Sequence, residues 1–371
     1  MRLLDRYLLR ELLVPFGYCL SGFLIFWISF DLFVKLGDFE RLKLTRVEIL
    51  HYYLVETPGQ MDIVLPVSLL MALLYALTNH AKHNELTAMR AAGVGVWRLS
   101  LPYLAVGLAF SAGLFALDEL WVPQSVEAAD QILNSHQTNQ PRAGAQAWET
   151  KLGFSNTREN REWLIEAYNL VTHEMIRPHV EWTLATGGRI VLSAERAAHL
   201  EGIWVFTNVQ EFVFPVTRGA LPSVQETNLL AMPEFSETPE AIKSEIKVSK
   251  INGLKEIKRA QLSIKEILDY KRLHRDNSSK GAMLDTKLHG RLAAPWTCLV
   301  VVLIALPFGA ASGRRNVFVG VASSILICFT YFVLLQLTLV LGGGGLWPWM
   351  AAWAPNFIFA AGGVLLTHLI R

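Results

Sequence analysis

The chain contains little of what builds disulfide scaffolds, metal centres or nucleotide-hydrolysing sites. Its 371 residues include only three cysteines, all within apolar runs, so no disulfide or metal framework is indicated. The ten histidines show no spacing typical of metal ligands, and no catalytic set is recognisable. The formal net charge of +2 gives no argument for nucleic-acid binding. A G-x-x-x-x-G-K-[ST] sequence is absent, so the chain lacks the phosphate-binding loop of P-loop ATPases.

Apolar residues are abundant instead. They make up 52% of the chain, with 11 tryptophans and a mean hydropathy of +0.32, which is typical of a membrane protein. Six segments are long and apolar enough to cross a bilayer, which takes about 20 residues. They are residues 12–36, 61–79, 98–122, 291–312, 316–342 and 347–370. The N-terminal sequence MRLLDRYLLRE is too charged for a cleaved signal, so the first span is expected to remain as an anchor.

A polar region of roughly 165 residues, 123–290, separates an N-terminal membrane half (1–122) from a C-terminal one (291–371) and is long enough for one domain. The runs RIVLSAERAA and GIWVFTNVQEFVF are rich in β-branched and aromatic residues, and Gly187-Gly188 marks a hairpin. We expect an all-β sandwich or open jelly roll of about six to ten antiparallel strands. The stretch after MPEFSETPEAI predicts a solvated connector, and SIKEILDYKRLHR a surface helix leading back to the membrane.

Basic residues are distributed unevenly among the segments that flank the spans. Those expected in the cytoplasm are Arg2, Arg6, Arg10, Lys82, Arg90, Arg98, Arg314, Arg315 and Arg371. The GGGGLWP loop between the fifth and sixth spans has no basic residue, while the loop 37–48 is a mild exception with three. The positive-inside rule therefore predicts six spans, both termini in the cytoplasm and the β domain outside.

The N-terminal arginines recur every four residues. Arg2, Arg6 and Arg10 form one stripe, and leucines at positions 4, 8 and 12 form a separate face. This pattern is typical of an interfacial helix on anionic lipid, and a contact with a partner protein is the alternative.

A charged segment, NHAKHNELTAMRAAGVGVWRLSLP, joins the second and third spans. If residues 80–92 form one helix, Ala81, Glu85, Ala88 and Ala92 share a face. Small side chains around a single carboxylate would let a soluble protein approach closely. The alternative is an amphipathic connector resting on lipid headgroups, although such helices favour bulky apolar anchors and a basic face. We expect a docking element.

This segment resembles the cytoplasmic coupling helix, here about residues 80–95, of LptF/LptG permeases, the membrane subunits of the bacterial lipopolysaccharide export ABC transporter. Glu85, Met89 and Gly93 match residues that recur in that loop, and Arg90 lies among them. The resemblance extends over essentially the whole chain, through LSIKEILDYKRLHR, KLHGRLAAPW and WPWMAAWAPNFIF. It implies that the loop inserts into a groove on a cytoplasmic ATPase. The LLDRY sequence and the spacing from Lys35 to Asp38 favour the LptG type.

The resemblance implies a transporter subunit of the bacterial inner membrane and not an enzyme. With a paralogous permease as its pseudo-symmetric partner, the chain would extract lipopolysaccharide and deliver it to a periplasmic jellyroll bridge protein. Two copies of the ATPase would use the ATP and Mg²⁺, so this chain is expected to hold no cofactor and no metal. A non-transporting scaffold whose β domain recruits periplasmic partners is the alternative. An intramembrane lipid enzyme lacks a convincing nucleophile and base.

Cationic residues near the outer end of the first span form a candidate substrate site. Asp31 and Lys35 are spaced for a helical ion pair, and Arg41 and Lys43 follow just outside the span. Ionisable residues within a span are costly and often functional. The resemblance implies that Lys35 faces substrate phosphates, which the three cations could bind through charge-assisted hydrogen bonds. The alternative is that Lys35 only snorkels to the interface.

Apolar strand residues in the β domain have two interpretations. They are expected to form its core, whereas the resemblance implies that acyl chains pass between the sheets to a neighbouring jelly roll. The residues concerned are Ile165, Val191, Val205, Phe206 and Phe212. An exposed sheet edge would also allow docking of a partner strand.

Overall fold

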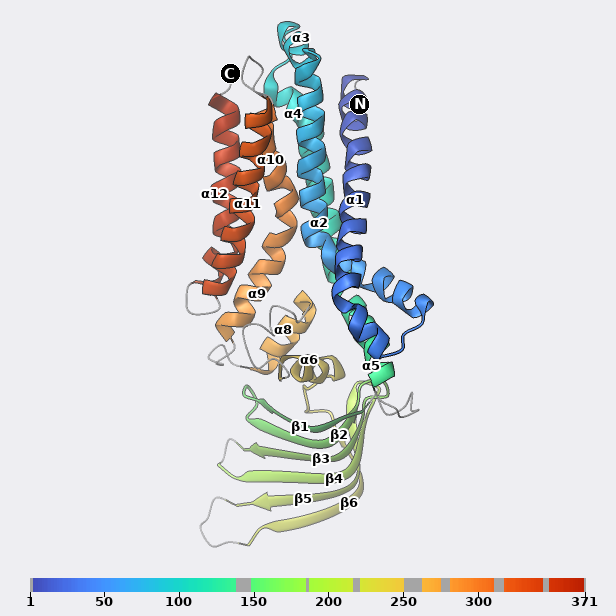
Figure 1. Ribbon diagram of the computed structural model, residues 1–371. Helices are drawn as coiled ribbons and strands as arrows, with labels where there is room; N and C mark the ends of the chain where they lie inside the picture. The colour runs from blue at the N-terminus through green and yellow to red at the C-terminus, as the bar shows by residue number, and fades with distance from the viewer. Residues whose placement is uncertain are drawn as a thin grey trace. The chain divides into compact units, whose positions relative to one another are not determined.

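The structure, a computed structural model, describes residues 3–137, 148–184, 187–215, 221–249, 262–274, 281–309, 317–342 and 347–369. Backbone contacts divide the chain into two compact units, Met1–Thr138 with Ala282–Arg371, and Asn139–Gly281. We call them the helical unit and the β unit (Figure 1). The predicted cytoplasmic residues Arg2, Arg314, Arg315 and Arg371 and most of the GGGGLWP loop lie outside the described residues.

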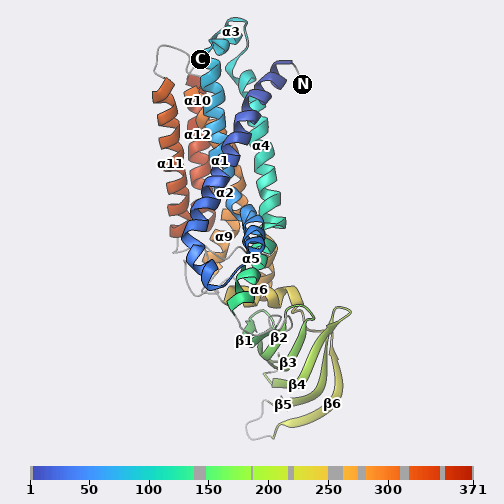
Figure 2. The ribbon, with the colours of Figure 1, turned by 45° about the vertical axis from the view of Figure 1, so that its right-hand side comes forward.

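The helical unit contains the six spans expected from the sequence, since six helical segments in the described parts of the chain are long and apolar enough to cross a membrane. They are α1 (Leu3–Arg41), α2 (Arg46–Lys82), α4 (Val96–Leu120), α9 with α10 (Gly281–Ala293 and Thr297–Gly309), α11 (Val317–Gly342) and α12 (Pro348–Leu369). A short 3₁₀ turn, η1 (Ala294–Trp296), joins α9 to α10. The N-terminal end of α1, the C-terminal end of α12 and the short helix α3 (Glu85–Ala91) lie at the same end of the bundle (Figures 1 and 2).

Helix α10 lies at the centre of the helical unit, where it packs against α2, α4, α11 and α12. Its valines and alanines, such as Val301 and Ala305, are fully buried. At the crossing with α12, a Cβ atom on Gly363 would lie 2.5 Å from the carbonyl oxygen of Leu303. Only glycine permits this approach, as is common where membrane helices pack closely.

Helix α1 runs without interruption from the N-terminal arginines into the first span. Leu8 and Leu12 are fully buried in the main apolar cluster of the helical unit. The expectation of an interfacial helix on anionic lipid is therefore wrong for this leucine face, because it packs against other helices. Further along, α1 exposes Tyr18, Phe26 and Phe33.

The β unit is built on one antiparallel sheet. The strands are β1 (Trp148–Asn156), β2 (Arg161–Asn169), β3 (Glu174–Thr183), β4 (Arg189–Leu200), β5 (Ile203–Phe214) and β6 (Ser223–Met232). Each pairs with the next along the chain, so their order is β1-β2-β3-β4-β5-β6. The fold class is confirmed, a membrane helical part with a β domain. The described strands nevertheless form a single curved sheet, not the two sheets of a sandwich (Figure 1).

A line of left-handed residues crosses the sheet. Lys151, Arg177 and Asn208 have φ angles of 57°, 46° and 53°, on alternate strands. In the strand register, Glu166 of β2 lies between Lys151 and Arg177, and Glu195 of β4 lies between Arg177 and Asn208. The pairing of each two neighbouring strands is interrupted at these residues. Departures from extended backbone of this kind bend a strand. Because these departures lie at one level of strands β1, β3 and β5, they bend the sheet at that level.

One face of the sheet is covered by the chain that follows it. Trp163, Trp204 and Phe206 are buried on this face, and Trp163 and Phe206 contact Phe235, which lies after β6. Helix α6 (Pro239–Ser249) buries Ile242 in the same cluster, and α8 (Ile264–Leu273) contributes Leu273. The predicted surface helix is confirmed. The predicted solvated connector, which begins after Ile242, is wrong for residues 243–249, because they continue α6 and bury Ile246 in this cluster.

The predicted core residues of the sheet divide between its faces. Ile165, Val191 and Phe206 are buried, whereas Val205 and Phe212 are only half-buried. Val205 and Phe206 are adjacent, so they point to opposite faces of the strand.

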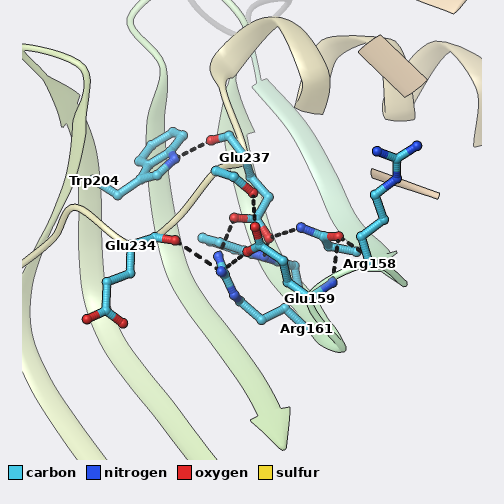
Figure 3. Close-up of polar contacts among 9 residues, drawn as sticks. Arg158, Glu159, Arg161, Trp204, Glu234 and Glu237 are labelled. Carbon is cyan, nitrogen blue, oxygen red and sulfur yellow. Dashed lines mark hydrogen bonds and ion pairs between the residues drawn. The ribbon is translucent and has the colours of Figure 1, made fainter. Parts of the chain in front are cut away.

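A buried ion pair fixes the segment that carries Phe235 (Figure 3). The Glu237 side chain is fully buried and accepts hydrogen bonds from Arg161 Nη1 (2.6 Å), Asn156 Nδ2 (2.9 Å) and Trp163 Nε1 (3.2 Å). Trp204 Nε1 donates to the Glu237 carbonyl. The Arg161 guanidinium also lies 4.4 Å from the Phe235 ring centroid. This network joins β1, β2 and β5 to the chain after β6.

Candidate functional site

The segment between α2 and α3 is where the sequence places the coupling element. Helix α2 ends at Lys82, and α3 covers only Glu85–Ala91. Asn84 separates them with a φ of 55°, in the left-handed region that ends helices. The expected continuous helix over residues 80–92 is therefore wrong, and Ala81 lies on α2, apart from the face of α3.

The carboxylate of Glu85 is held by two residues from other helices. Its Oε2 accepts a hydrogen bond from the Tyr7 hydroxyl of α1 at 2.9 Å and lies 2.7 Å from Nδ1 of the buried His80 in α2. Since an ionised carboxylate only accepts, Nδ1 is the donor. These hydrogen bonds, His80 first, hold the pKa of Glu85 below its ordinary value. We call Tyr7, His80 and Glu85 the α3 latch.

A second contact joins the start of α1 to the chain just after α3. Arg98, in the first turn of α4, pairs with Asp5 at 2.8 Å. The N-terminal turns of α1 are thus connected to the coupling segment on both of its sides. Movement of α3 would be transmitted to α1, α2 and α4.

The exposed side chains of α3 and of the residue that follows it are small. Thr87, Ala88, Ala91 and Ala92 are exposed. We call these four residues the α3 face. Leu86 is buried in the helical core.

The other predicted coupling residues, Met89, Arg90 and Gly93, differ in their surroundings. Met89 is half-buried and packs against the core of the helical unit, and Arg90 is half-buried. Gly93 ends α3 with a φ of 84°, a conformation that other residues rarely adopt. The structure thus brings Glu85 and Met89 to the inner side of α3.

The candidate substrate site contains Lys35 within a network of partners. Its Nζ lies 3.0 Å from Asp31, 3.2 Å from Glu56 and 2.7 Å from the Tyr52 hydroxyl. Tyr53 donates to Asp31 at 3.1 Å. The expected Asp31–Lys35 pair is present, and Lys35 also ties α1 to α2.

Arg41 ends α1, and Lys43 lies in the turn that leads to α2. Both are exposed, and Lys43 has a φ of 54°. Their side chains are thus available at the end of the hairpin that carries Lys35. Among the residues that the structure describes, no group of histidine, cysteine and acidic residues could hold a metal ion.

Several residues of these two sites were not predicted. Tyr7 is far from Glu85 in sequence, and His80 lies on a different helix. Tyr52 and Glu56, the partners of Lys35, come from α2. The only sequence signal for the last two was the mixture of aromatic and charged residues in VEILHYYLVET.

Comparison with known proteins identifies the family of the chain. The family model described as lipopolysaccharide export system permease LptF/LptG matches residues 6–368, nearly the whole chain. A comparison with individually curated proteins found no match. Six apolar helices and this match make the chain a multi-pass membrane protein. It belongs to the LptF/LptG family of lipopolysaccharide export permeases.

Proposed function

We propose that this permease is the membrane subunit of an ABC transporter that extracts lipopolysaccharide from the bacterial inner membrane. It passes the lipid to a periplasmic bridge protein, and a separate cytoplasmic ATPase drives the step. In this proposal the chain itself binds neither ATP nor Mg²⁺ and needs no metal or other cofactor. The observation that carries it is the exposed α3 face, on a helix whose Glu85 side chain is tied to α1 and α2.

The α3 face suits a groove on a second protein. Its four exposed side chains are small, so a partner backbone can approach closely, and Gly93 adds no side chain beyond the end of the helix. The inner side of α3 is engaged through Glu85, so a push on the outer side reaches α1 and α2 through Tyr7 and His80. Coupling therefore runs through the latch, and Glu85 acts inside the permease.

Lys35, Arg41 and Lys43 are the proposed contacts for substrate phosphates. In this structure Lys35 is satisfied by Asp31, Glu56 and Tyr52. An arriving phosphate would compete for its ammonium group, while Arg41 and Lys43 are already exposed. Such competition would loosen the link between α1 and α2 when substrate binds.

Two helices and one strand provide surfaces for further partners. Helix α1 exposes Phe26, Phe30 and Phe33, and α11 exposes Leu326 and Phe329. In the proposal, these apolar faces line a cavity for the lipid, which a paralogous permease completes by pairing with this chain.

Among the strands that the structure describes, β6 lies at an edge of the sheet. Most of its residues are exposed, including Val224 at 52% and Leu229 at 62%. A free edge with apolar side chains can accept a strand from another β protein. We assign this edge to the bridge protein.

Replacing Ala88 by tryptophan tests the proposal. The bulky side chain would block close approach to the α3 face without disturbing the latch. We expect the purified complex to lose its ATPase and ATP-driven lipid release. The matched control is Val171→Trp at an exposed turn of the β unit, which should keep both. Retention of the ATPase and of lipid release in Ala88→Trp would contradict the proposal.

A non-transporting scaffold is the second candidate, favoured by the exposed β6 edge alone. A scaffold would purify with periplasmic proteins but without an ATPase, and Glu85→Lys would leave its complexes unchanged. The permease proposal predicts that Glu85→Lys breaks the latch and uncouples hydrolysis from transport.

A further inference from the structure

A groove lies between α1 and α2 in the helical unit. Its volume is about 810 Å³, which is within the range of cavities that hold small molecules, roughly 300–1,000 Å³. It is lined by residues between Arg10 and Cys19 of α1 and between Met71 and Thr78 of α2, so it follows each helix for about two turns. We call it the α1–α2 groove. Among its described lining residues, none belongs to the α3 latch or to the network around Lys35.

The two ends of the groove differ in polarity. Since α1 begins and α2 ends at the end of the bundle that carries α3, Arg10, Glu11 and Thr78 form the mouth of the groove nearest to α3 (Figures 1 and 2). The apolar lining lies farther along both helices and consists of Val14, Pro15, Met71 and Leu74. A charged mouth followed by an apolar channel suits an amphiphile, with its headgroup at the mouth and an acyl chain in the channel.

The groove is open toward the surroundings of the bundle. Tyr18 and Tyr75, which line it, are 76% and 60% exposed. Both belong to membrane spans, where tyrosine is typical of the level at which acyl chains meet headgroups. A membrane lipid therefore reaches the groove sideways, without separation of α1 from α2.

The charged side chains of the mouth are available to a ligand. Arg10 is exposed and Glu11 is half-buried, and neither makes a hydrogen bond or an ion pair with another residue that the structure describes. A carboxylate partly removed from water is stabilised by a cation that donates hydrogen bonds to it. Because Arg10 and Glu11 are adjacent, the mouth presents a positive and a negative group to the same molecule.

This pair of charges distinguishes among phospholipid headgroups. A headgroup with a phosphate and a primary ammonium group makes two charge-assisted contacts, the phosphate with Arg10 and the ammonium with Glu11. Phosphatidylglycerol has no cation and would place its phosphate beside an unpaired Glu11. Phosphatidylcholine has a quaternary ammonium group, which carries no N–H to donate.

We propose that the α1–α2 groove binds one molecule of phosphatidylethanolamine. Its phosphate contacts Arg10, its ammonium group contacts Glu11, and one acyl chain lies along Val14 and Leu74. The bound lipid fills the space between the two helices one turn beyond Tyr7 of the α3 latch. It supports the packing of α1 on α2 at this end of the bundle and does not depend on ATPase docking.

Native mass spectrometry of the purified full-length chain tests the headgroup assignment. From an equimolar mixture of phosphatidylethanolamine, phosphatidylcholine and phosphatidylglycerol with identical acyl chains, the wild type should retain phosphatidylethanolamine preferentially. Glu11→Gln removes one charge-assisted contact, so the preference over phosphatidylglycerol should fall about tenfold. Equal retention of the three lipids by the wild type, or an unchanged preference in Glu11→Gln, would overturn the assignment.

A matched pair of tryptophan substitutions tests the groove itself. Val14→Trp would fill the channel and should abolish lipid retention. Leu13→Trp is the control, because Leu13 is 45% and Val14 50% exposed, but only Val14 is a lining residue. Ala88→Trp should leave lipid retention unchanged, so this proposal and that of ATPase docking can fail separately. Unchanged retention in Val14→Trp would overturn the proposal.

Cross-linking of the wild type gives a result even if the substituted chains fail to fold. Phosphatidylethanolamine with a photo-reactive acyl chain should label peptides that contain residues 10–19 and 71–78 in preference to those of the exposed helix α11. Labelling of α11 to the same extent would overturn the proposal. In native membranes, a photo-reactive amino acid at Tyr18 should capture phospholipid. Capture of a second protein or of lipopolysaccharide alone would show that another occupant covers the groove.

Discussion

Replacement of Arg161 by methionine should destabilise the β unit strongly. Methionine keeps the length of the side chain but removes the cation, so the fully buried carboxylate of Glu237 stays with only neutral donors, Asn156 and Trp163. Removing one partner of a buried ion pair costs about 3–5 kcal/mol. For a unit of this size, about 1 kcal/mol lowers the Tm by roughly 2–4 °C, so we expect a fall of about 6–20 °C.

Thermal unfolding of the full-length chain, followed by near-ultraviolet circular dichroism, would measure this change, since Trp163 and Trp204 are both in the network. Arg177→Met is the matched control. Arg177 pairs with Glu166 at 2.9 Å, but the two side chains are 72% and 54% exposed, so the loss should be at most about 1 kcal/mol. Adding Glu237→Gln to Arg161→Met should restore part of the stability. Equal effects of the two arginine substitutions would refute the reasoning from burial.

Three further predictions concern the two candidate sites. Tyr7→Phe removes one hydrogen bond to the Glu85 carboxylate, worth about 1.5 kcal/mol, so hydrogen exchange of the α3 amides should speed up roughly tenfold, while Tyr18→Phe, 76% exposed, should have no effect. Because the pKa of Glu85 lies below its ordinary 4.5, the latch is complete above that value and is lost as pH falls through the lowered pKa. A spin label at Ala88→Cys should then become more mobile, and Glu85→Gln should remove this pH dependence. Lys35→Asp should abolish lipid transfer without loss of assembly, and undiminished transfer would count against Lys35 as a substrate contact.

The spans and two of the strands could be located because each depends on a local pattern. Apolar runs mark the six helices, and strands β4 and β5 follow the β-branched and aromatic runs after Gly188. The hydrophobic residues of α6 are few and lie in a charged background, so only their burial against the sheet reveals that helix.

The contacts that define the sites could not be predicted, because they join residues far apart in sequence. Tyr7 meets Glu85 across 78 positions, and Lys35 meets Glu56 across 21. Spacing within one helix suggested Asp31 as a partner of Lys35 but could not indicate a second helix. The break at Asn84 depends on a single left-handed residue, which a helical pattern of alanines conceals.

Cross-linking from the α3 face tests the central claim most directly. With a photo-reactive amino acid at Ala92, the permease in native membranes should cross-link to a cytoplasmic protein that hydrolyses ATP, and nucleotide should change the yield. The same group at Val171 should not reach that protein. Cross-links from position 92 to lipid or periplasmic proteins alone would contradict the account.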